Sequence, residues 1–342
     1  LLELESVRFI DLPPTLTLEP LDFSVPLSAL TVEGPIAEDA TLVAILDSGI
    51  VSGHPALAPA VGEAASFIEG KSPVDAHGHG TAIAGFALYG DIQACIASNK
   101  FATNLRLLSG RVLNEEARYD RKLIASQVKE AVEYFNGELG CRIFNISFGD
   151  EMQPYDDRHV KGLAVVLDEI ARDRDVLFVV SAGNFKGTET VPTHWRNDYP
   201  DYLFDNECRI IDPAPALNVL TVGSIARYDV DRNAQRYPSD VNHQPIARVD
   251  EPSPFTRTGP GPLGAVKPDI VEYGGNWSVD IRSGADPRPR NDPNLEELAL
   301  KHDFAADRFL CTFRGTSAAA PKITNLAGRL LSEYPDASAN LL

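Results

Sequence analysis

The sequence has few cysteines and no long apolar run, and each shortage excludes a class of protein. Its four cysteines, Cys95, Cys141, Cys208 and Cys311, lie far apart and form no C-x-x-C pair. We therefore expect buried free thiols, with two isolated disulfides as the alternative, and not a disulfide-stabilised scaffold. No run approaches the ~18 apolar residues of a membrane-spanning helix. One of the longest, VLFVV at 176–180, fits a buried strand.

The sequence is also poor in basic residues relative to acidic ones. It has 31 Lys and Arg against 49 Asp and Glu, which gives a formal net charge of −18. Because binding to phosphate groups needs clustered Lys and Arg, we expect neither nucleic acid nor an anionic membrane as a partner. The acidity either keeps the protein soluble or attracts basic substrates.

The remaining composition is that of an ordinary globular protein. Hydrophobic residues make up 44% and charged residues 23% of the 342 residues, which allows one large α/β domain or two smaller ones. Residues 1–40 contain five prolines and scattered apolar side chains, so we interpret them as an N-terminal extension packed on the main domain. Residues 41–342 then form that domain.

From residue 41 onward, short apolar runs alternate with stretches in which apolar residues recur at helical spacing. The apolar runs predict strands within 41–49, 141–150, 175–184 and 216–226. The helical spacing predicts helices within 81–90, 123–135 and 162–175 and after Ser317. Strands that are apolar on both faces and separated by helices indicate a covered parallel sheet. We therefore predict a three-layer α/β fold with a mostly parallel central sheet and helices on both faces.

Polar residues stand where these strands end and helices begin, which is where reactive groups gather in open parallel sheets. Asp47, Ser147 and Asn184 follow apolar runs, whereas His79 and Ser317 stand at predicted helix starts. Taken alone, each has an ordinary interpretation as a turn, cap, packed or surface residue. Taken together, they supply a nucleophile, a base, an orienting carboxylate and an amide for a developing oxyanion.

The segment around Ser317 suits a nucleophile. Gly315 and Thr316 allow a tight approach, and the three alanines at 318–320 let the following helix pack closely. We place Pro321 in the first turn of that helix, where its missing N–H does no harm. A serine at such a helix start lies at the positive end of the helix dipole.

Six segments resemble, in order, those of the subtilisin-like serine peptidases, the subtilases. They are AILDSGIVSGHPAL, HGHGTAIAG, FNISFG, VVSAGN, SPFTRTGPGPLGAVKPDI and GTSAAAP. The resemblance extends over residues 41–333 and implies a catalytic triad of Asp47, His79 and Ser317. It assigns the base to His79 because only this histidine is followed by the Gly-Thr of the family motif. Asn184 in SAGN is then the side-chain donor to the oxyanion.

The same resemblance implies where a substrate binds. The segment SFG is similar to the family strand that pairs with the substrate backbone and lines its side-chain pockets, and AG of SAGN is similar to a wall of the primary pocket. The implied substrate-binding residues are Ser147, Phe148, Gly149, Ala182 and Gly183.

The function implied is that of a serine endopeptidase that cleaves protein or peptide substrates through an acyl-enzyme and requires no cofactor. His79 accepts the Ser317 proton and returns it to the leaving amine, while Asp47 orients His79. An alternative from another class is a regulated or latent peptidase-like protein that acts with a partner protein, for example an ATPase.

The stretch DAHGH offers a metal-binding alternative, because Asp75, His77 and His79 alternate and share one side of an extended segment. A catalytic zinc site needs three protein ligands within an organised shell, and this interpretation leaves the other motifs unexplained. We therefore predict no catalytic metal and a surface role for His77. Structural calcium, which many subtilases hold, stays an alternative, but the sequence argues against it, because Ala56 stands where the family commonly has an aspartate ligand.

Two features depart from the compact members of the family. The interval between Asn184 and Ser317 is long, so we expect extra segments at 186–213 and 275–308, one of which borders the substrate cleft. The chain ends soon after the serine motif, which predicts a truncated C-terminus. The unpaired cysteines and the acidity favour the cytoplasm over secretion, which is the alternative.

Overall fold

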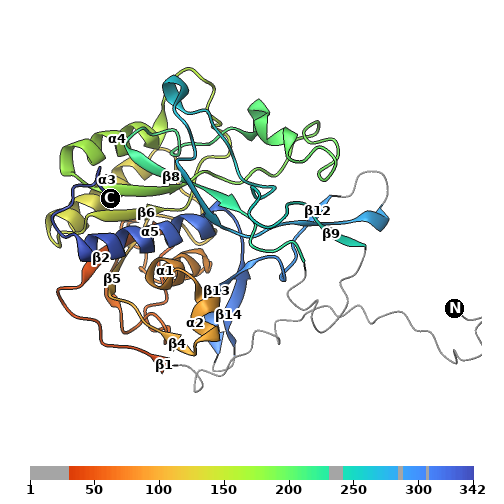
Figure 1. Cartoon of the computed structure of the whole chain (residues 1–342). Helices are drawn as coiled ribbons and strands as arrows, with labels where there is room; N and C mark the ends of the chain where they lie inside the picture. The colour runs from red at the N-terminus through yellow and green to blue at the C-terminus, as the bar shows by residue number, and fades with distance from the viewer. Residues whose placement is uncertain (1–30, 231–241, 284–287, 306–307) are drawn as a thin grey trace, which may run out of the picture.

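The computed structural model describes residues 31–230, 242–283, 288–305 and 308–342, and within these ranges it has a seven-stranded sheet in which all pairings are parallel (Figure 1). In spatial order, its strands are β10 (Ile270–Tyr273), β8 (Val219–Ile225), β7 (Leu177–Ser181), β6 (Ile143–Ile146), β2 (Thr41–Asp47), β5 (Leu105–Arg111) and β3 (Val61–Ser66).

Helices cover both faces of this sheet. Helices α1 (His79–Tyr89) and α5 (Thr316–Glu333) pack on one face, and α3 (Ile124–Gly137) and α4 (Gly162–Arg174) pack on the other. Figure 1 shows α5 running beside the strands at the centre of the sheet. The three-layer α/β fold predicted from the sequence is therefore confirmed.

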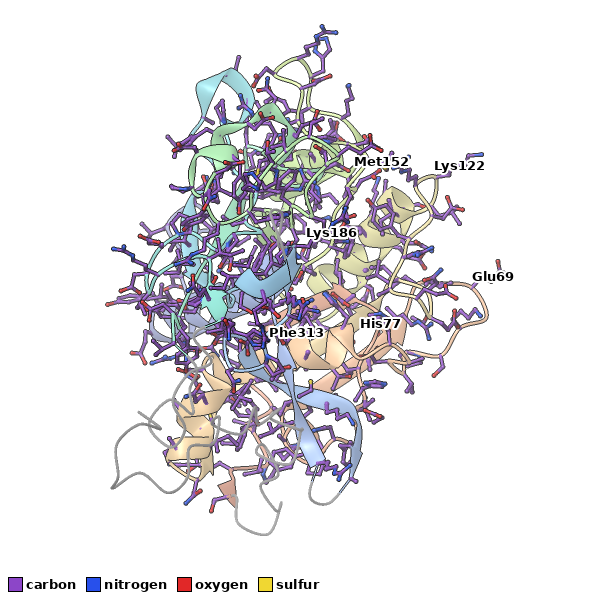
Figure 2. The ribbon with its side chains drawn as sticks, turned by 90° about the vertical axis from the view of Figure 1, so that its right-hand side faces the viewer. Glu69, His77, Lys122, Met152, Lys186 and Phe313 are labelled. Carbon is purple, nitrogen blue, oxygen red and sulfur yellow. The ribbon has the colours of Figure 1, made fainter. Side chains whose placement is uncertain are left out.

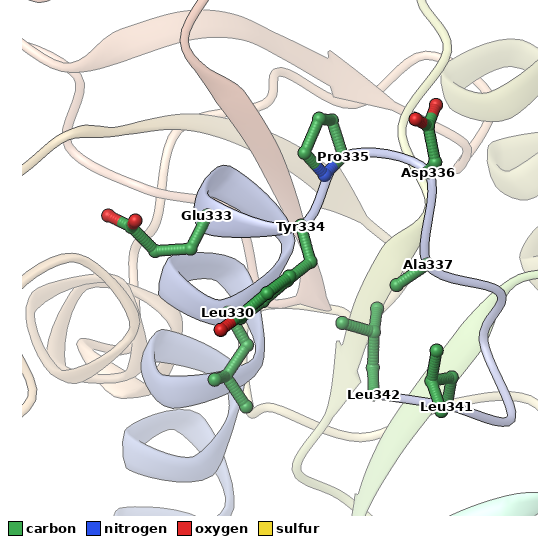
Figure 3. Close-up of a pocket in the computed structure, with 8 residues that line it drawn as sticks. All are labelled: Leu330, Glu333, Tyr334, Pro335, Asp336, Ala337, Leu341 and Leu342. Carbon is green, nitrogen blue, oxygen red and sulfur yellow. The ribbon is translucent and has the colours of Figure 1, made fainter.

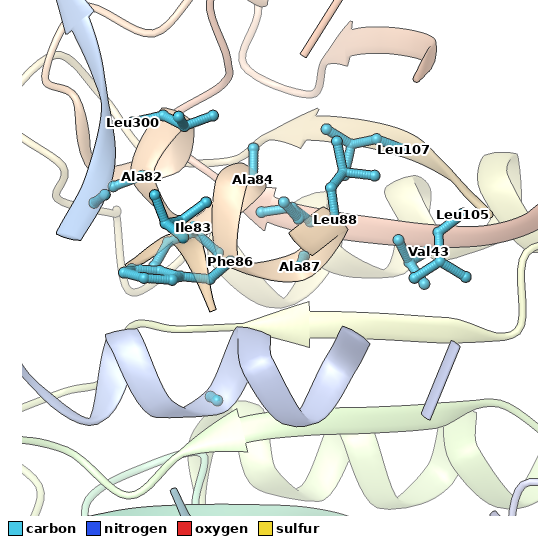
Figure 4. Close-up of a cluster of buried hydrophobic side chains, with 14 of the residues drawn as sticks. Val43, Ala82, Ile83, Ala84, Phe86, Ala87, Leu88, Leu105, Leu107 and Leu300 are labelled. Carbon is cyan, nitrogen blue, oxygen red and sulfur yellow. The ribbon is translucent and has the colours of Figure 1, made fainter. Parts of the chain in front are cut away.

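The two faces follow from the period-two alternation of a buried strand. In β2, Val43 and Ile45 belong to the hydrophobic cluster under α1 and α5, whereas Ala44 and Leu46 belong to the cluster under α3 and α4. Figure 4 shows the first cluster, with Val43 beside the apolar side chains of α1. Because all four side chains are fully buried, a charged residue is tolerated only where the strand ends.

Smaller elements surround the central layers. The strands β1 and β4 pair in parallel, β12, β11 and β9 form a three-stranded sheet, and β13 and β14 form an antiparallel pair. Their bounds are β1 (Thr31–Val32), β4 (Lys100–Phe101), β9 (His243–Pro245), β11 (Ser278–Asp280), β12 (Pro289–Arg290), β13 (Glu297–Ala305) and β14 (Arg308–Phe313). The short helices are α2 (Ile92–Ala97), η3 (Asp201–Phe204), η4 (Asn206–Cys208), η5 (Pro262–Gly264) and η6 (Ile281–Ser283).

Two details of the predicted helices are wrong. Helix α5 begins at Thr316, so Pro321 lies in its second turn, and the carbonyl of Ser317 lacks the N–H donor that residue 321 would otherwise supply. Leu123 precedes α3 and is exposed, because the buried stripe begins at Ile124. Of the expected N-terminal extension at 1–40, residues 1–30 lie outside the described residues. The described part, residues 31–40, contains β1.

The four cysteines are free, with Cys141 and Cys208 buried and Cys95 and Cys311 partly buried. Within the described ranges, no helix has the length and apolar character needed to cross a bilayer. A hollow of about 650 Å³ lies between the end of α5 and the final residues, with Tyr334 and Leu342 among those lining it (Figure 3). Helix α5 is about 27 Å long at 1.5 Å per residue, so this hollow is remote from Ser317.

Candidate active site

The predicted site residues meet at the carboxyl edge of the central sheet. Strand β2 ends at Asp47, β6 ends one residue before Ser147, and β7 ends just before the segment Ala182–Asn184. These three strands are neighbours in the order β7, β6, β2. Because parallel strands end at the same edge, residues far apart in the sequence are brought together there.

Asp47 and His79 form a hydrogen-bonded pair. The distance between Asp47 Oδ1 and His79 Nδ1 is 2.8 Å, and the Asp47 side chain is only 1% exposed. The backbone N–H of Ser48 also donates to Asp47 Oδ1. Burial of the ring lowers the pKa of His79, but the charge of Asp47, the hydrogen bond to it and the charge of Asp75 raise that pKa above its ordinary value. The pair therefore favours a protonated imidazole more strongly than a free histidine does.

The loop that presents His79 is organised around the buried carboxylate of Asp75. Its Oδ1 accepts hydrogen bonds from the Ser48 hydroxyl and from the N–H groups of His77 and Gly78. Its Oδ2 accepts from both the N–H and the hydroxyl of Thr81. The hydroxyl of Ser48 in turn accepts from the N–H of Gly80, so Asp75 and Ser48 together fix the start of α1.

These hydrogen bonds bear on the metal-binding alternative. Both oxygens of Asp75 are occupied by donors of the loop itself, which leaves the carboxylate a structural acceptor and not a free ligand. In the described part of the chain, no group of three or more His, Cys, Asp or Glu side chains is arranged to hold a metal ion. The ring of His77 lies 6.4 Å from that of His79, measured between centroids.

Ser317 is the second residue of α5, which begins at Thr316 directly after Gly315. Its hydroxyl donates to the backbone carbonyl of Ser147 at 2.9 Å, and among the described residues no hydrogen bond joins it to His79. The ring of Phe313, four residues before Ser317, lies 5.5 Å from the ring of His79. The structure thus brings Ser317 to the same edge of the sheet as the Asp47–His79 pair.

Asn184 is held against the segment that precedes Ser317. Its Oδ1 accepts from the N–H of Thr316 at 2.9 Å and from the Thr316 hydroxyl at 3.2 Å, and the N–H of Gly183 donates to that hydroxyl. Gly315 has a φ of 123°, and a Cβ added there would lie 2.8 Å from Asn184 Nδ2. The two N–H donors of the amide therefore lie directly beside the residues leading into Ser317.

Arg257 supports the loop that carries Asn184, and no sequence motif singles this residue out. Its buried guanidinium donates to the backbone carbonyls of Asn184, Glu207 and Arg209 at 3.3, 3.0 and 2.8 Å. Burial of the guanidinium lowers the pKa of Arg257. The residue thus ties the carbonyl of Asn184 to the segment around residue 208.

Both extra segments expected from the sequence reach this region. A Cβ added at Gly78 would lie 2.4 Å from His302 Nδ1, so β13 packs against the loop before His79. Ile211, from the other segment, packs against Gly149 and Gly183. Figure 2 shows His77 and Phe313 on the same face of the molecule as Lys186 and Met152.

A parallel sheet with an Asp–His pair and a serine-bearing helix at its carboxyl edge defines the class of subtilisin-like α/β proteins. The chain belongs to the subtilase family, because the model of the Subtilase family matches residues 38–342. The prediction of this family from the sequence motifs is therefore confirmed.

Two curated relatives are similar to this chain. The uncharacterized protein y4bN of Sinorhizobium fredii (strain NBRC 101917 / NGR234) is 42% identical over 225 residues, which cover 64% of this chain and 50% of y4bN. The serine protease AprX of Bacillus subtilis (strain 168) is 26% identical over 304 residues, which cover 86% of this chain and 57% of AprX. The chain thus spans about half the length of the curated relatives it matches.

Among solved structures, a cold adapted subtilisin-like serine proteinase matches with a TM-score of 0.53 and 17% sequence identity. The match covers 90% of this chain and 81% of that proteinase. At this identity, the likeness concerns the fold.

Proposed function

We propose that this chain is a serine endopeptidase in which Asp47, His79 and Ser317 form the catalytic triad. The observation that carries the proposal is the buried Asp47–His79 hydrogen bond, formed at the sheet edge to which α5 brings Ser317. Membership of the subtilase family supports the same reaction class. A protein or peptide is the substrate, and the proposed reaction uses no cofactor.

In the first half of the reaction, the Ser317 hydroxyl leaves the carbonyl of Ser147 and turns toward His79. Apo hydrogen bonds in catalytic sites often differ from those of the substrate complex in this way. His79 Nε2 takes the hydroxyl proton as Oγ attacks the scissile carbonyl carbon, and Asp47 stabilises the resulting imidazolium.

The negative charge on the substrate oxygen is stabilised by the Nδ2 group of Asn184 and by the backbone N–H of Ser317. The second of these donors is available because the first N–H groups of a helix have no partner within the helix. His79 then gives its proton to the leaving amine, and a water molecule repeats the sequence on the acyl-enzyme.

An active-site-directed fluorophosphonate tests this proposal. We expect covalent labelling of the intact protein and cleavage of casein, both abolished in Ser317→Ala because the nucleophile is missing. Ser332→Ala is the matched control, since Ser332 lies on the same helix and its hydroxyl bonds Thr41 and Gly328 instead. Absence of labelling on folded protein, or labelling that survives Ser317→Ala, contradicts the proposal.

A latent protein that acts with a partner is the second candidate. The observation favouring it is that the Ser317 hydroxyl donates to Ser147 and not to His79. Cleavage of casein by the purified chain without any partner counts against latency, whereas cleavage that begins only when an ATP-driven partner is added supports it. A cytoplasmic location is likewise a proposal, in keeping with the free thiols.

A further inference from the structure

A side chain from a third segment separates two predicted substrate-binding segments. One is SFG, which is predicted to line the side-chain pockets, and the other is AG of SAGN, which is predicted to wall the primary pocket. A Cβ added at Gly149 would lie 2.9 Å from Cδ1 of Ile211, and one added at Gly183 would lie 2.6 Å from the same atom. Cγ1 of Ile211 is within 3.0 Å of both positions. The isoleucine side chain therefore occupies the space that the two glycines leave open.

Ile211 differs from its neighbour Ile210 in what it contacts. Ile210 is part of the hydrophobic cluster under α3 and α4, whereas Ile211 belongs to none of the three hydrophobic clusters found among the described residues. It is nevertheless only 2% exposed. A buried isoleucine outside the core, packed on two glycines of a predicted binding pocket, is placed to limit what the pocket can hold.

The backbone around Ile211 is fixed on both sides. Ile211 forms an isolated antiparallel bridge with Pro154, and its carbonyl accepts from the N–H of Ala214. The next residue, Asp212, accepts from the N–H groups of Leu163 and Ala164 at the start of α4. Displacement of Ile211 by a large substrate side chain would disturb these contacts, so the isoleucine is a wall and not a flexible gate.

An ion pair joins the chain just beyond the two wall segments. Lys186, three residues after Gly183, donates to Glu151, two residues after Gly149, at 2.6 Å. Figure 2 shows Lys186 and Met152 on the face that carries the site. The pair links the outer ends of both walls at the surface.

We propose that Ile211 closes the primary pocket, so that the enzyme cleaves after small residues such as glycine, alanine or serine. The inference rests on the proposed peptidase function and adds its substrate class. The physical reason is steric, because a leucine or phenylalanine side chain needs the volume that Ile211 fills between Gly149 and Gly183.

Two peptides that differ only in alanine or leucine before the scissile bond test the inference. We expect the unmodified chain to prefer alanine by about tenfold or more in kcat/KM, because one to a few methylenes in a pocket discriminate by that order. In Ile211→Ala, the leucine-to-alanine ratio rises by about tenfold or more, and Ile211→Val gives a smaller rise in the same direction. Ile210→Ala is the matched control and leaves the ratio unchanged, since its side chain faces the core.

The outcomes separate this inference from the proposed function. Fluorophosphonate labelling of Ser317 combined with equal cleavage of both peptides overturns the inference and leaves the peptidase intact. Absence of labelling and of cleavage overturns the proposed function, and the inference with it. Should Ile211→Ala fail to fold, mass-spectrometric mapping of casein fragments from the unmodified chain decides. Fragments ending mainly in small residues support the inference, and fragments ending mainly in large apolar residues overturn it.

Discussion

The half of the site that carries Asp47 and His79 and the half that carries Asn184 and Gly315 are stabilised by different forces. In the first half, two buried carboxylates organise the chain through hydrogen bonds to N–H groups, hydroxyls and an imidazole. In the second half, glycines allow backbone and side chains to approach within distances that a Cβ would prevent. Charge in the first half sets the protonation of His79, whereas volume in the second half sets what can lie beside Ser317.

This difference teaches how each half responds to substitution. A change of charge at constant shape affects the first half through the pKa of His79 and through the loop that holds it. A change of volume at constant charge affects the second half through the position of Asn184, the proposed oxyanion donor, and the room for substrate. The four predictions below test this division, from the largest expected effect to the smallest.

Removal of the Asn184 amide tests the donor role in the second half. Asn184→Ala should lower kcat by about 10²–10³-fold, a magnitude known for such donors in a related enzyme. Asn184→Asp is the sharper variant, because it keeps an oxygen to accept from Thr316 but has no N–H to donate. Steady-state kinetics on one peptide measure both. An Asp variant within tenfold of the unmodified enzyme shows that the amide only braces Thr316.

Neutralising Asp75 tests the role of charge in the first half. Asp75→Asn weakens hydrogen bonds to a charged group, so we expect unfolding to become easier by about 1.5–3 kcal/mol, measured by urea denaturation.

The same variant changes the pH dependence of activity. His79 must be neutral to accept a proton, so kcat/KM rises with pH through the raised pKa of His79, above the ordinary 6.5. Loss of the Asp75 charge lowers that pKa, which moves the rise to lower pH. His77→Ala is the control, because the ring of His77 lies nearby but accepts no bond from this network. If kcat/KM of Asp75→Asn rises at the same pH as that of the unmodified enzyme, Asp75 has no electrostatic effect on His79.

A methyl group at Gly315 tests close packing in the second half. Its backbone, with φ 123° and ψ 169°, lies in a region that is essentially restricted to glycine, so Gly315→Ala should cost about 1–3 kcal/mol of stability. The added Cβ also displaces the Asn184 amide, so kcat should fall with it. Gly53→Ala is the matched control, since a Cβ there meets no atom within 4 Å. Equal melting temperatures and rates for the two variants contradict the packing argument.

The smallest effect is expected at the surface of the second half. Lys186→Ala breaks the ion pair between Lys186 and Glu151, two side chains that are 67% and 50% exposed. The loss in the free energy of unfolding should therefore stay within about 1 kcal/mol and shrink with added salt. Lys71→Ala, which breaks a similarly exposed pair with Glu115, is the comparison. A loss in Lys186→Ala several times that in Lys71→Ala indicates that the Lys186–Glu151 pair clamps the pocket walls.

Much of the fold and of the site could be predicted from the sequence because the signals are local. The run TLVAIL predicts a strand that is apolar on both faces, and the aspartate after it can only stand where the strand ends. The glycines and alanines around Ser317 predict a close-packed helix start. The sequence places Pro321 one turn too early, because the first residue of a helix depends on the chain before it as well as on the helix's own sequence.

The sequence by itself determined the family, the order of the segments proposed to carry the triad and the strands that end at them, since each depends on residues adjacent in the chain. Only the tertiary structure decided that Asp75 holds the loop before His79, that Arg257 supports Asn184, and that Ile211 stands between Gly149 and Gly183. These arrangements join residues that are tens of positions apart, and the loop held by Asp75 is one of them through its bond to Ser48, 27 positions away. Contacts of this kind arise from the packing of strands β2, β6 and β7 side by side, and no local pattern of residue types encodes them.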